Sequence, residues 1–188
     1  MRLRVFVAIP ISNNFKKQVE NIRPRLLKAQ ADVKWVETEN YHLTVKFLGN
    51  VEESQLDGVI QALRRAGDES PPFTLVPRGT GFFPNHRRPR VFWIGINGEL
   101  DKAFWLGERV DAYLAELGFE VEKKRRYHLT LGRLRSEKNA AALVQAAQEV
   151  DQVANFQSFT VNEMRLMQSQ LNREGPTYSV IKTFPLQG

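Results

Sequence analysis

The 188-residue sequence contains no cysteine and only three histidines. The lack of cysteine excludes disulfides, thiolate metal sites and cysteine nucleophiles. No apolar run approaches the roughly 20 residues that a membrane-spanning helix needs. The basic and apolar N-terminal segment stops at Pro10 with no small-residue cleavage site after it, so we interpret it as a first strand rather than a signal peptide. We therefore expect a cytoplasmic protein that does not contact a membrane.

The charge is unbalanced toward basic residues. Lysine and arginine number 27 against 21 acidic residues, which gives a net charge of +6. A basic surplus favours a polyanionic partner, although an ordinary basic surface explains the net charge equally well. The basic residues also cluster at positions 87–90 and 123–126, and each cluster lies near a histidine. This clustering favours a role in binding phosphate.

The chain contains an internal repeat. The tetrapeptide Tyr-His-Leu-Thr at residues 41–44 recurs at residues 127–130, an offset of 86 residues. Arg-Val-Phe at 4–6 recurs at 90–92, and Phe-Thr at 73–74 recurs at 159–160, at the same offset. A repeat at one fixed offset indicates duplicated structural units. We expect two similar lobes related by an approximate two-fold axis, with equivalent residues facing each other across it.

Hydrophobic periodicity indicates an α+β protein. Alternating apolar residues predict strands near residues 3–9, 33–36, 41–48, 73–82, 90–97, 126–134, 157–168 and 177–185, the third of them ending at Gly49. Helices are expected near 12–29, 52–66, 100–117 and 137–149. Many connections resemble hairpins, which favours antiparallel sheets with helices on their outer faces. No linker-like stretch is present, so residues 1–188 should form a single bilobal domain with a cleft between its lobes.

The repeated tetrapeptide places chemical groups on one face of a strand. Residues i and i+2 of a strand share a face, so His42 points with Thr44, and His128 points with Thr130. The tyrosine and leucine of each motif share the opposite, apolar face. A polar face that carries histidine beside a hydroxyl is typical of an open catalytic groove. An isolated pair of this kind is more often structural, but two copies in a matched repeat favour a functional interpretation.

Two imidazoles suit in-line displacement at phosphorus. An unperturbed histidine titrates near pH ~6.5, so one imidazole can accept a proton while the other donates one. Threonine hydroxyls can donate to non-bridging phosphate oxygens, where negative charge develops. A metal site is disfavoured, because the motif strands carry no carboxylate beside the histidines. The third histidine, His86, lies in a basic loop at 84–89, where we expect an exposed side chain.

These motifs resemble the paired His-x-Thr-x motifs of the 2H phosphoesterase superfamily. Residues 41–49, 88–93 and 128–133, together with the Ser-x-Leu and Gly-Pro-x-Tyr pattern at 169–178, are similar to the RNA 2′,3′-cyclic phosphodiesterases, also called 2′-5′ RNA ligases. The resemblance covers essentially the whole chain. It implies two lobes, each an antiparallel sheet with outer helices, and a catalytic cleft between them.

The resemblance also implies an activity and the role of each motif residue. The expected reaction is hydrolysis of a terminal 2′,3′-cyclic phosphate of RNA to a 2′-phosphate, and some relatives also join RNA ends through a 2′-5′ bond. By carry-over, His42 is the proton donor, His128 is the proton acceptor, and Thr44 and Thr130 hold the phosphate. No metal or nucleotide cofactor is expected, and we expect a monomer. Pseudo-symmetry alone does not decide which histidine is the acid.

Three further residues are weaker candidates for substrate binding. Arg133 could clamp phosphate, but strict alternation places it opposite His128 unless a bulge turns it. Lys46 has the parity of His42 and could line the rim of the cleft. Phe82 is our candidate for stacking on the terminal base, with Phe83 then in the core. Phe47 has the parity of the apolar face and is expected in the core, while the place of Trp35 is left open.

Two other functions remain as alternatives. One is a 2H enzyme with a different substrate, such as a small cyclic nucleotide, an ADP-ribose cyclic phosphate or a 2′-5′ linkage, in which case loops 83–89 and 168–176 would set the specificity. The other is an RNA-binding protein without turnover, which the intact histidines and threonines of both motifs disfavour.

Overall fold

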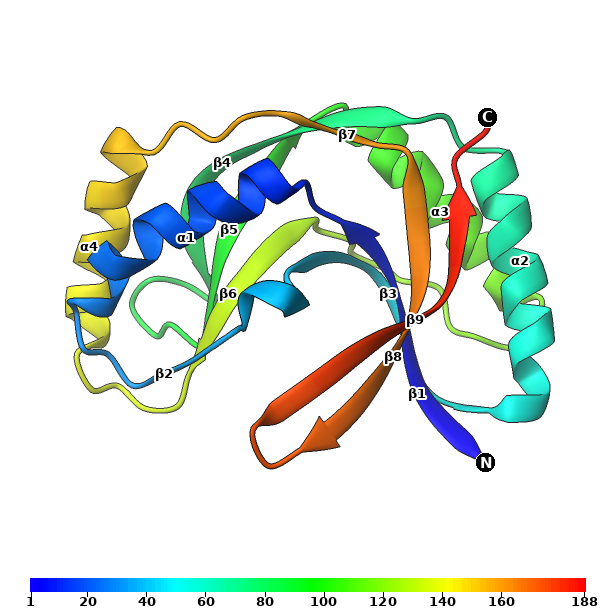
Figure 1. Ribbon diagram of the computed structural model, residues 1–188, viewed down its shortest axis with the longest axis horizontal. Coiled ribbons are helices and arrows are strands. Elements are labelled where there is room, and N and C mark those ends of the chain that lie inside the picture. Colours follow the sequence, from blue (N-terminus) through cyan, green and yellow to red (C-terminus); the bar gives the residue numbers. More distant parts are fainter.

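The computed structural model describes all residues from Met1 to Gly188 and has the expected α+β composition (Figure 1). The strands are β1 (Arg2–Pro10), β2 (Val33–Trp35), β3 (His42–Glu52), β4 (Phe73–Phe83), β5 (Val91–Gly98), β6 (His128–Leu134), β7 (Phe159–Val161), β8 (Glu163–Asn172) and β9 (Gly175–Pro185). The α-helices are α1 (Asn13–Leu27), α2 (Leu56–Asp68), α3 (Leu100–Ala115) and α4 (Ala140–Val153). Short 3₁₀ turns at Thr38–Asn40 and Glu53–Gln55 flank β3.

The nine strands form one curled antiparallel sheet whose centre carries the repeated motifs. The strand order is β7-β4-β5-β6-β3-β1-β8-β9, and β2 pairs with β6. The central strands β3 and β6 join through a single residue pair, Leu43 with Leu129. These two leucines are equivalent by the 86-residue offset. Equivalent residues of the two halves therefore meet at the centre of the sheet, as the expected two-fold relation requires.

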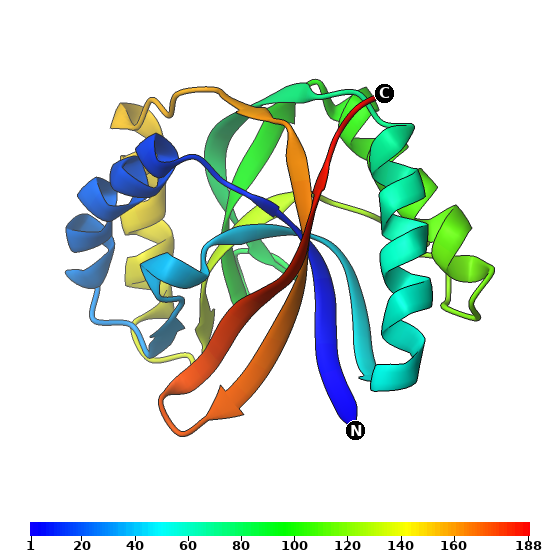
Figure 2. The same ribbon diagram turned by 45° about the vertical axis from the view of Figure 1, so that its right-hand side comes forward.

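Two pairs of helices cover the outer faces of the sheet. Helix α1 packs with α4 over the lobe that contains β4, β5, β6 and β7, whereas α2 packs with α3 over the lobe that contains β1, β3, β8 and β9 (Figures 1 and 2). Each helix pair combines one helix from either half of the sequence. The two lobes are consequently interwoven along the chain.

Helix α1 begins where the sequence predicts. Ser12 accepts a hydrogen bond from the backbone N–H of Phe15 at 3.1 Å, which satisfies one of the free donors of the first turn. Phe15 lies inside the core beside Phe156 and Phe159. The helix continues through Pro24 and ends at Leu27. Pro24 therefore lies within the last turn and does not end the helix at its own position.

Equivalent β-bulges interrupt both motif strands. The pairing of β1 with β3 shifts between Val7 and Ala8 and leaves Val45 as an extra residue. The pairing of β5 with β6 shifts between Phe92 and Trp93 and leaves Leu131, the equivalent position, as the extra residue. A bulge puts two consecutive side chains on the same face and reverses the alternation beyond it. Residues after each bulge therefore face the opposite way from what strict alternation predicts.

Strand β3 also runs further than expected. A second shift lies between Val5 and Phe6, and Gly49 beyond it adopts a φ of +72°, a conformation that glycine allows at little cost. The prediction that Gly49 ends the strand was wrong, because this irregularity bends β3 and its pairing with β1 continues to Glu52.

Candidate active site

The two motif histidines lie on either side of the central leucine pair, each held in the same way. His42 Nδ1 lies 2.7 Å from the carbonyl oxygen of Asn40, and His128 Nδ1 lies 3.1 Å from that of Arg126. Each carbonyl belongs to the residue two positions earlier, and the two positions are equivalent in the repeat. A carbonyl oxygen only accepts hydrogen bonds, so each Nδ1 carries a proton. Nε2 is then the nitrogen that titrates in both imidazoles.

The motif threonines share the faces of their histidines, as predicted. Thr44 Oγ1 lies 3.0 Å from His42 Nε2, so its hydroxyl can donate to the neutral imidazole. Thr130 lies in the ladder opposite Trp93 and is half-buried, as is Thr44. By contrast, Tyr41 and Tyr127 are buried in the core, as expected from their parity.

Burial lowers the pKa of both histidines from the ordinary value. For His42, desolvation is the main cause, and the charge of His128 adds to it against the opposing hydrogen bond to Asn40. For His128, desolvation again dominates, and the charge of Arg133 lowers the pKa further against the hydrogen bond to Arg126. Both imidazoles are therefore biased toward the neutral form. A bound anion between them would favour protonation, because opposite charge stabilises the imidazolium.

The bulge in β6 turns Arg133 toward His128. Beyond the extra residue Leu131, alternation puts Arg133 on the face of His128; Arg133 is exposed, and its charge adds to burial in lowering the pKa of His128. The sequence analysis required a bulge before Arg133 for this residue to share the face of His128, and the structure has that bulge. Its role in binding phosphate stays a prediction.

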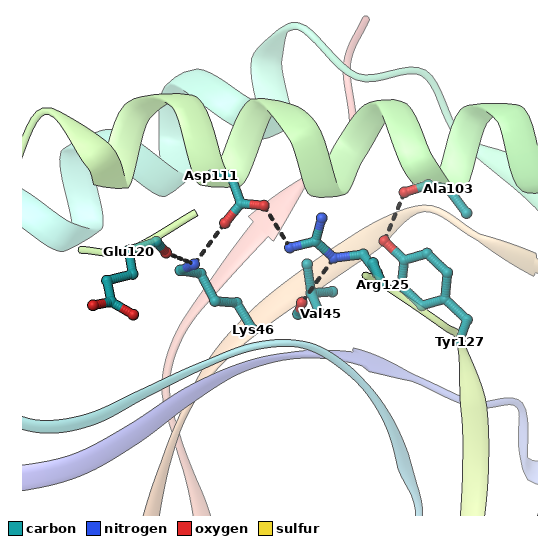
Figure 3. Close-up of polar contacts among 7 residues, drawn as sticks. All are labelled: Val45, Lys46, Ala103, Asp111, Glu120, Arg125 and Tyr127. Atoms are coloured by element: carbon teal, nitrogen blue, oxygen red, sulfur yellow. Dashed lines mark hydrogen bonds and ion pairs between the residues drawn. The ribbon is translucent and has the colours of Figure 1, made fainter. Parts of the chain in front are cut away.

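The bulge in β3 reverses two expectations. Lys46 is only 5% exposed and pairs with Asp111 of α3 at 2.6 Å, so the prediction that it lines the cleft was wrong (Figure 3). Phe47, expected in the core, is 68% exposed, and its ring centroid lies 6.1 Å from that of Phe6 on the cleft face. Phe47 is the equivalent of Arg133 in the repeat. The two halves of the site thus present an aromatic ring on one side and a cation on the other.

The prediction that Phe82 faces the terminal base while Phe83 lies in the core was also wrong. Phe82 is buried and stacks on Phe92 in the core with ring centroids 4.8 Å apart. Phe83 points to the cleft face, where its ring centroid lies 5.1 Å from that of His128. The preceding bulge-like irregularity of β4, between Pro77 and Thr80, helps to set this parity.

Sequence reasoning assigned no role to three other aromatic residues that surround the histidines. Phe6 and Tyr178 lie with their ring centroids 4.9 and 5.4 Å from that of His42, and Trp93 lies 6.3 Å from His128. Phe6 alternates with the core residues of β1, so strand parity could have placed it on the cleft face. Trp35, whose place the sequence did not decide, packs edge-on against Phe92.

A pocket of about 350 Å³ adjoins His128, and His42 is not among its lining residues. Aromatic, apolar and basic side chains line it without any acidic residue. The lining residues are Arg78, Phe83, Trp93, Gly95, Ile96, Asn97, Leu100, Phe104, Arg126, Tyr127 and His128. Arg78 and Arg126 are both exposed, and the pocket therefore suits a ligand that has both a flat ring and a negative charge.

The chain contains no cluster of three or more histidine, cysteine, aspartate or glutamate residues that could hold a metal ion. His86 lies exposed in its loop, as expected, and lines a separate pocket with Asp151. No helix is both long enough and apolar enough to cross a membrane.

Known proteins share this sequence and architecture. The family described as LigT-like phosphoesterase matches the chain twice, at residues 9–93 and 94–178. A Methanothermobacter thermautotrophicus protein named RNA 2′,3′-cyclic phosphodiesterase is 34% identical over 99% of this chain and 100% of its own. A protein of the same name from Aquifex aeolicus is 32% identical over 99% of this chain and 98% of its own.

Solved structures share the fold along the whole chain. A crystal structure from Thermus thermophilus has a TM-score of 0.80 and 26% identity, and each chain covers 99% of the other. Apo LigT of E. coli has a TM-score of 0.79 over 100% of this chain and 99% of its own, at 23% identity, which shows a common fold. With the two matches of the family, one on each half of the repeat, the chain belongs to the LigT-like phosphoesterases, the 2H family that its paired His-x-Thr motifs resemble.

Proposed function

We propose that this protein is an RNA 2′,3′-cyclic phosphodiesterase that hydrolyses a terminal 2′,3′-cyclic phosphate to a 2′-phosphate by two-histidine acid–base catalysis. The observation that carries the proposal is the arrangement of His42 and His128 about the Leu43–Leu129 pair, each with Nδ1 on a backbone carbonyl. This arrangement leaves Nε2 as the titrating nitrogen of both imidazoles, and that of His42 lies 3.0 Å from the hydroxyl of Thr44. The names of the relatives from Methanothermobacter and Aquifex support the choice of substrate.

In the proposed reaction, water attacks phosphorus in line with the bond to O3′. His128 Nε2 takes the proton of the water as the P–O bond forms, and His42 Nε2 gives a proton to O3′ as the P–O3′ bond breaks. The product retains phosphate on O2′. His42 ends neutral and His128 ends protonated, and exchange with solvent restores the starting state. The assignment of donor and acceptor follows the family resemblance.

Other residues of the cleft suit the rest of the substrate. We assign Thr44 and Thr130 the role of donating to non-bridging oxygens, and Arg133 that of supplying a positive charge on the His128 side. The exposed ring of Phe47, beside Phe6, offers a platform on the His42 side for the terminal base. All of these groups come from one chain, so we expect the enzyme to act as a monomer, and we expect it to act in the cytoplasm.

The test uses a defined oligonucleotide that ends in a 2′,3′-cyclic phosphate. We expect turnover that survives chelators and a product whose phosphate is on the 2′ oxygen. A 3′-phosphate product would overturn the assignment of the leaving oxygen while retaining the two-histidine site. Binding without turnover across several cyclic-phosphate ends would instead support the non-catalytic alternative.

We also propose that the cleft supports 2′-5′ ligation, in which a 5′-hydroxyl replaces water as the nucleophile: His128 takes its proton, the new P–O5′ bond forms, and O3′ leaves with the proton from His42. The supporting observation is the pocket beside His128, whose 350 Å³ far exceeds what an attacking water needs. The 5′-terminal nucleotide of an acceptor strand, with a free 5′-hydroxyl, could lie there with its base against Phe83 and its 3′-phosphate near Arg78. Incubation with a 5′-hydroxyl oligonucleotide in excess should then give a 2′-5′ joined product, and Phe83→Ala should reduce joining more than hydrolysis. If Phe83→Ala reduced joining and hydrolysis equally, this use of the pocket would be contradicted.

A further inference from the structure

One face of helix α3 contacts strand β3 and the segment that leads to strand β6. Ala103, Gly107 and Asp111 are spaced four residues apart and so lie along one stripe of the helix. The hydroxyl of Tyr127 donates to the carbonyl oxygen of Ala103 at 2.6 Å (Figure 3). Arg125 lies against Gly107, where an added Cβ would come within 2.6–2.8 Å of the guanidinium and Cδ. The stripe thus receives side chains of the segment immediately before His128.

Asp111 is the centre of a buried network of charges. Its two carboxylate oxygens accept hydrogen bonds from Lys46 Nζ at 2.6 Å and from Arg125 Nη2 at 2.9 Å. The three side chains are at most 8% exposed. Burial alone would raise the pKa of Asp111, but the hydrogen bonds and charges of the two cations outweigh it and hold the pKa below the ordinary value. The carboxylate therefore stays ionised between two cations.

The two cations also donate hydrogen bonds to backbone carbonyls of two separate segments. Lys46 Nζ donates to the carbonyl oxygen of Glu120, and Arg125 Nε donates to that of Val45 at 3.0 Å (Figure 3). Val45 is the bulge residue of β3 and directly follows Thr44. Arg125 directly precedes Arg126, whose carbonyl oxygen holds Nδ1 of His128. A single carboxylate is thereby linked to the backbone on which each motif depends.

In the other half of the repeat, a backbone hydrogen bond holds the carbonyl of the equivalent bulge. There the bulge carbonyl of Leu131 accepts a hydrogen bond from the backbone N–H of Val36 at 2.8 Å, just after β2. Gly132, the equivalent of Lys46, leaves room for β2, since an added Cβ would lie 2.5 Å from Val33. No strand corresponds to β2 beside β3. The buried charges occupy the place that a paired strand holds in the other half.

We infer that Asp111 is a positioning residue for catalysis, acting through Arg125 on the carbonyl that orients His128 and on the bulge that orients Thr44. The inference rests on the proposed two-histidine function. The carboxylate touches neither substrate nor imidazole. Its effect reaches the chemistry because misplacing a reacting group by about 1 Å can cost about a hundredfold in rate.

The first test is the Asp111→Asn variant, which keeps the size of the side chain and removes its charge. We expect kcat to fall about tenfold to a hundredfold and KM to change less than kcat, because orientation is lost while the phosphate contacts remain. Glu116→Gln is the matched control. Glu116 follows α3 directly and pairs with Arg65 in solvent at 3.2 Å, so its kinetics should not change.

A second variant separates positioning from stability. Buried ion pairs are often replaced by apolar side chains of similar volume without loss of stability, so the triple variant Lys46→Met, Asp111→Leu, Arg125→Met should fold. We expect it to retain the low kcat of Asp111→Asn. Wild-type kcat in either folded variant would overturn the inference. Loss of folding in both variants would assign the network to stability alone and would overturn it as well.

An NMR titration provides a readout that does not depend on activity. The chain has three histidines, so His42, His86 and His128 give three imidazole signals. His128 faces the charges of His42 and Arg133, neither of which the variants remove. We expect the variants to change the titration of His128 through its weakened bond to Arg126. An unchanged His128 would contradict the inference even if the wild-type protein had no activity on cyclic phosphates.

Discussion

Phe47 gives a quantitative test of how the cleft holds its substrate. The side chain is 68% exposed, beside Phe6 on the His42 side of the site, and the bulge at Val45 alone turns it there. We therefore expect Phe47→Ala to remove a stacking surface for the terminal base. Because the ring is mostly in solvent, the free energy of unfolding should change by only about 0.5 kcal/mol or less.

The expected size of the effect follows from the energy of base stacking. A base stacked on an aromatic side chain contributes about 1–3 kcal/mol. Since each ~1.4 kcal/mol is a factor of ten, kcat/KM should fall about fivefold to a hundredfold, mainly through KM. Phe47→Trp should retain most of the activity, because indole also presents a flat apolar ring.

The assay compares two substrates that both end in a 2′,3′-cyclic phosphate. One has adenine on the terminal ribose and the other has an abasic terminal ribose. The loss caused by Phe47→Ala should appear with adenine and vanish with the abasic end. The control is Val153→Ala, which removes another exposed apolar side chain, 59% exposed, at the end of α4. Equal losses with both substrates, or no loss with either, would refute the reasoning.

Three further predictions concern the cation, the pH profile and the second bulge. Arg133→Ala should lower kcat/KM about tenfold to a hundredfold, since a charged hydrogen bond contributes about 1.5–3 kcal/mol, and Arg133→Lys should recover only part in steady-state assays. Because burial lowers the pKa of His42 and His128 from 6.5, kcat/KM should already decline with rising pH below 6.5; a plateau extending above pH 8 would contradict this. Gly132→Ala should lower the free energy of unfolding by about 1–3 kcal/mol in urea titrations, because the added Cβ overlaps Val33. An unchanged free energy of unfolding would contradict this packing of β2 against Gly132.

The repeat made the centre of the site predictable from sequence. Two copies of one motif at a fixed offset imply equivalent places in two lobes, and alternation then separates histidine and threonine from tyrosine and leucine. The structure confirms the equivalence in the Leu43–Leu129 pair and in the matching carbonyls of Asn40 and Arg126. These features depend on local pattern and symmetry, which the sequence contains.

The errors all lie beyond a β-bulge or other strand irregularity. Alternation was extended from His42 to Lys46 and Phe47, but the extra residue Val45 reverses both side chains. A bulge depends on pairing with a strand far away in sequence, so residues 42–47 alone do not reveal it. The partner of Lys46, Asp111, is 65 residues away on α3, so no local pattern links the two residues. The 86-residue offset does make Phe47 equivalent to Arg133. An aromatic ring at one position and a cation at the other already indicated that the two halves have unequal roles.

The central claim is that His42 and His128 act together as one acid–base pair. The most direct measurement is kcat on a 2′,3′-cyclic phosphate oligonucleotide for His42→Ala, His128→Ala and the double variant, each checked for folding by circular dichroism. Groups that act as a unit give non-additive losses. We expect each single variant to lose at least about a hundredfold and the double variant to lose little more than either. Near-normal turnover in either single variant, or strictly multiplicative losses in the double variant, would contradict the claim.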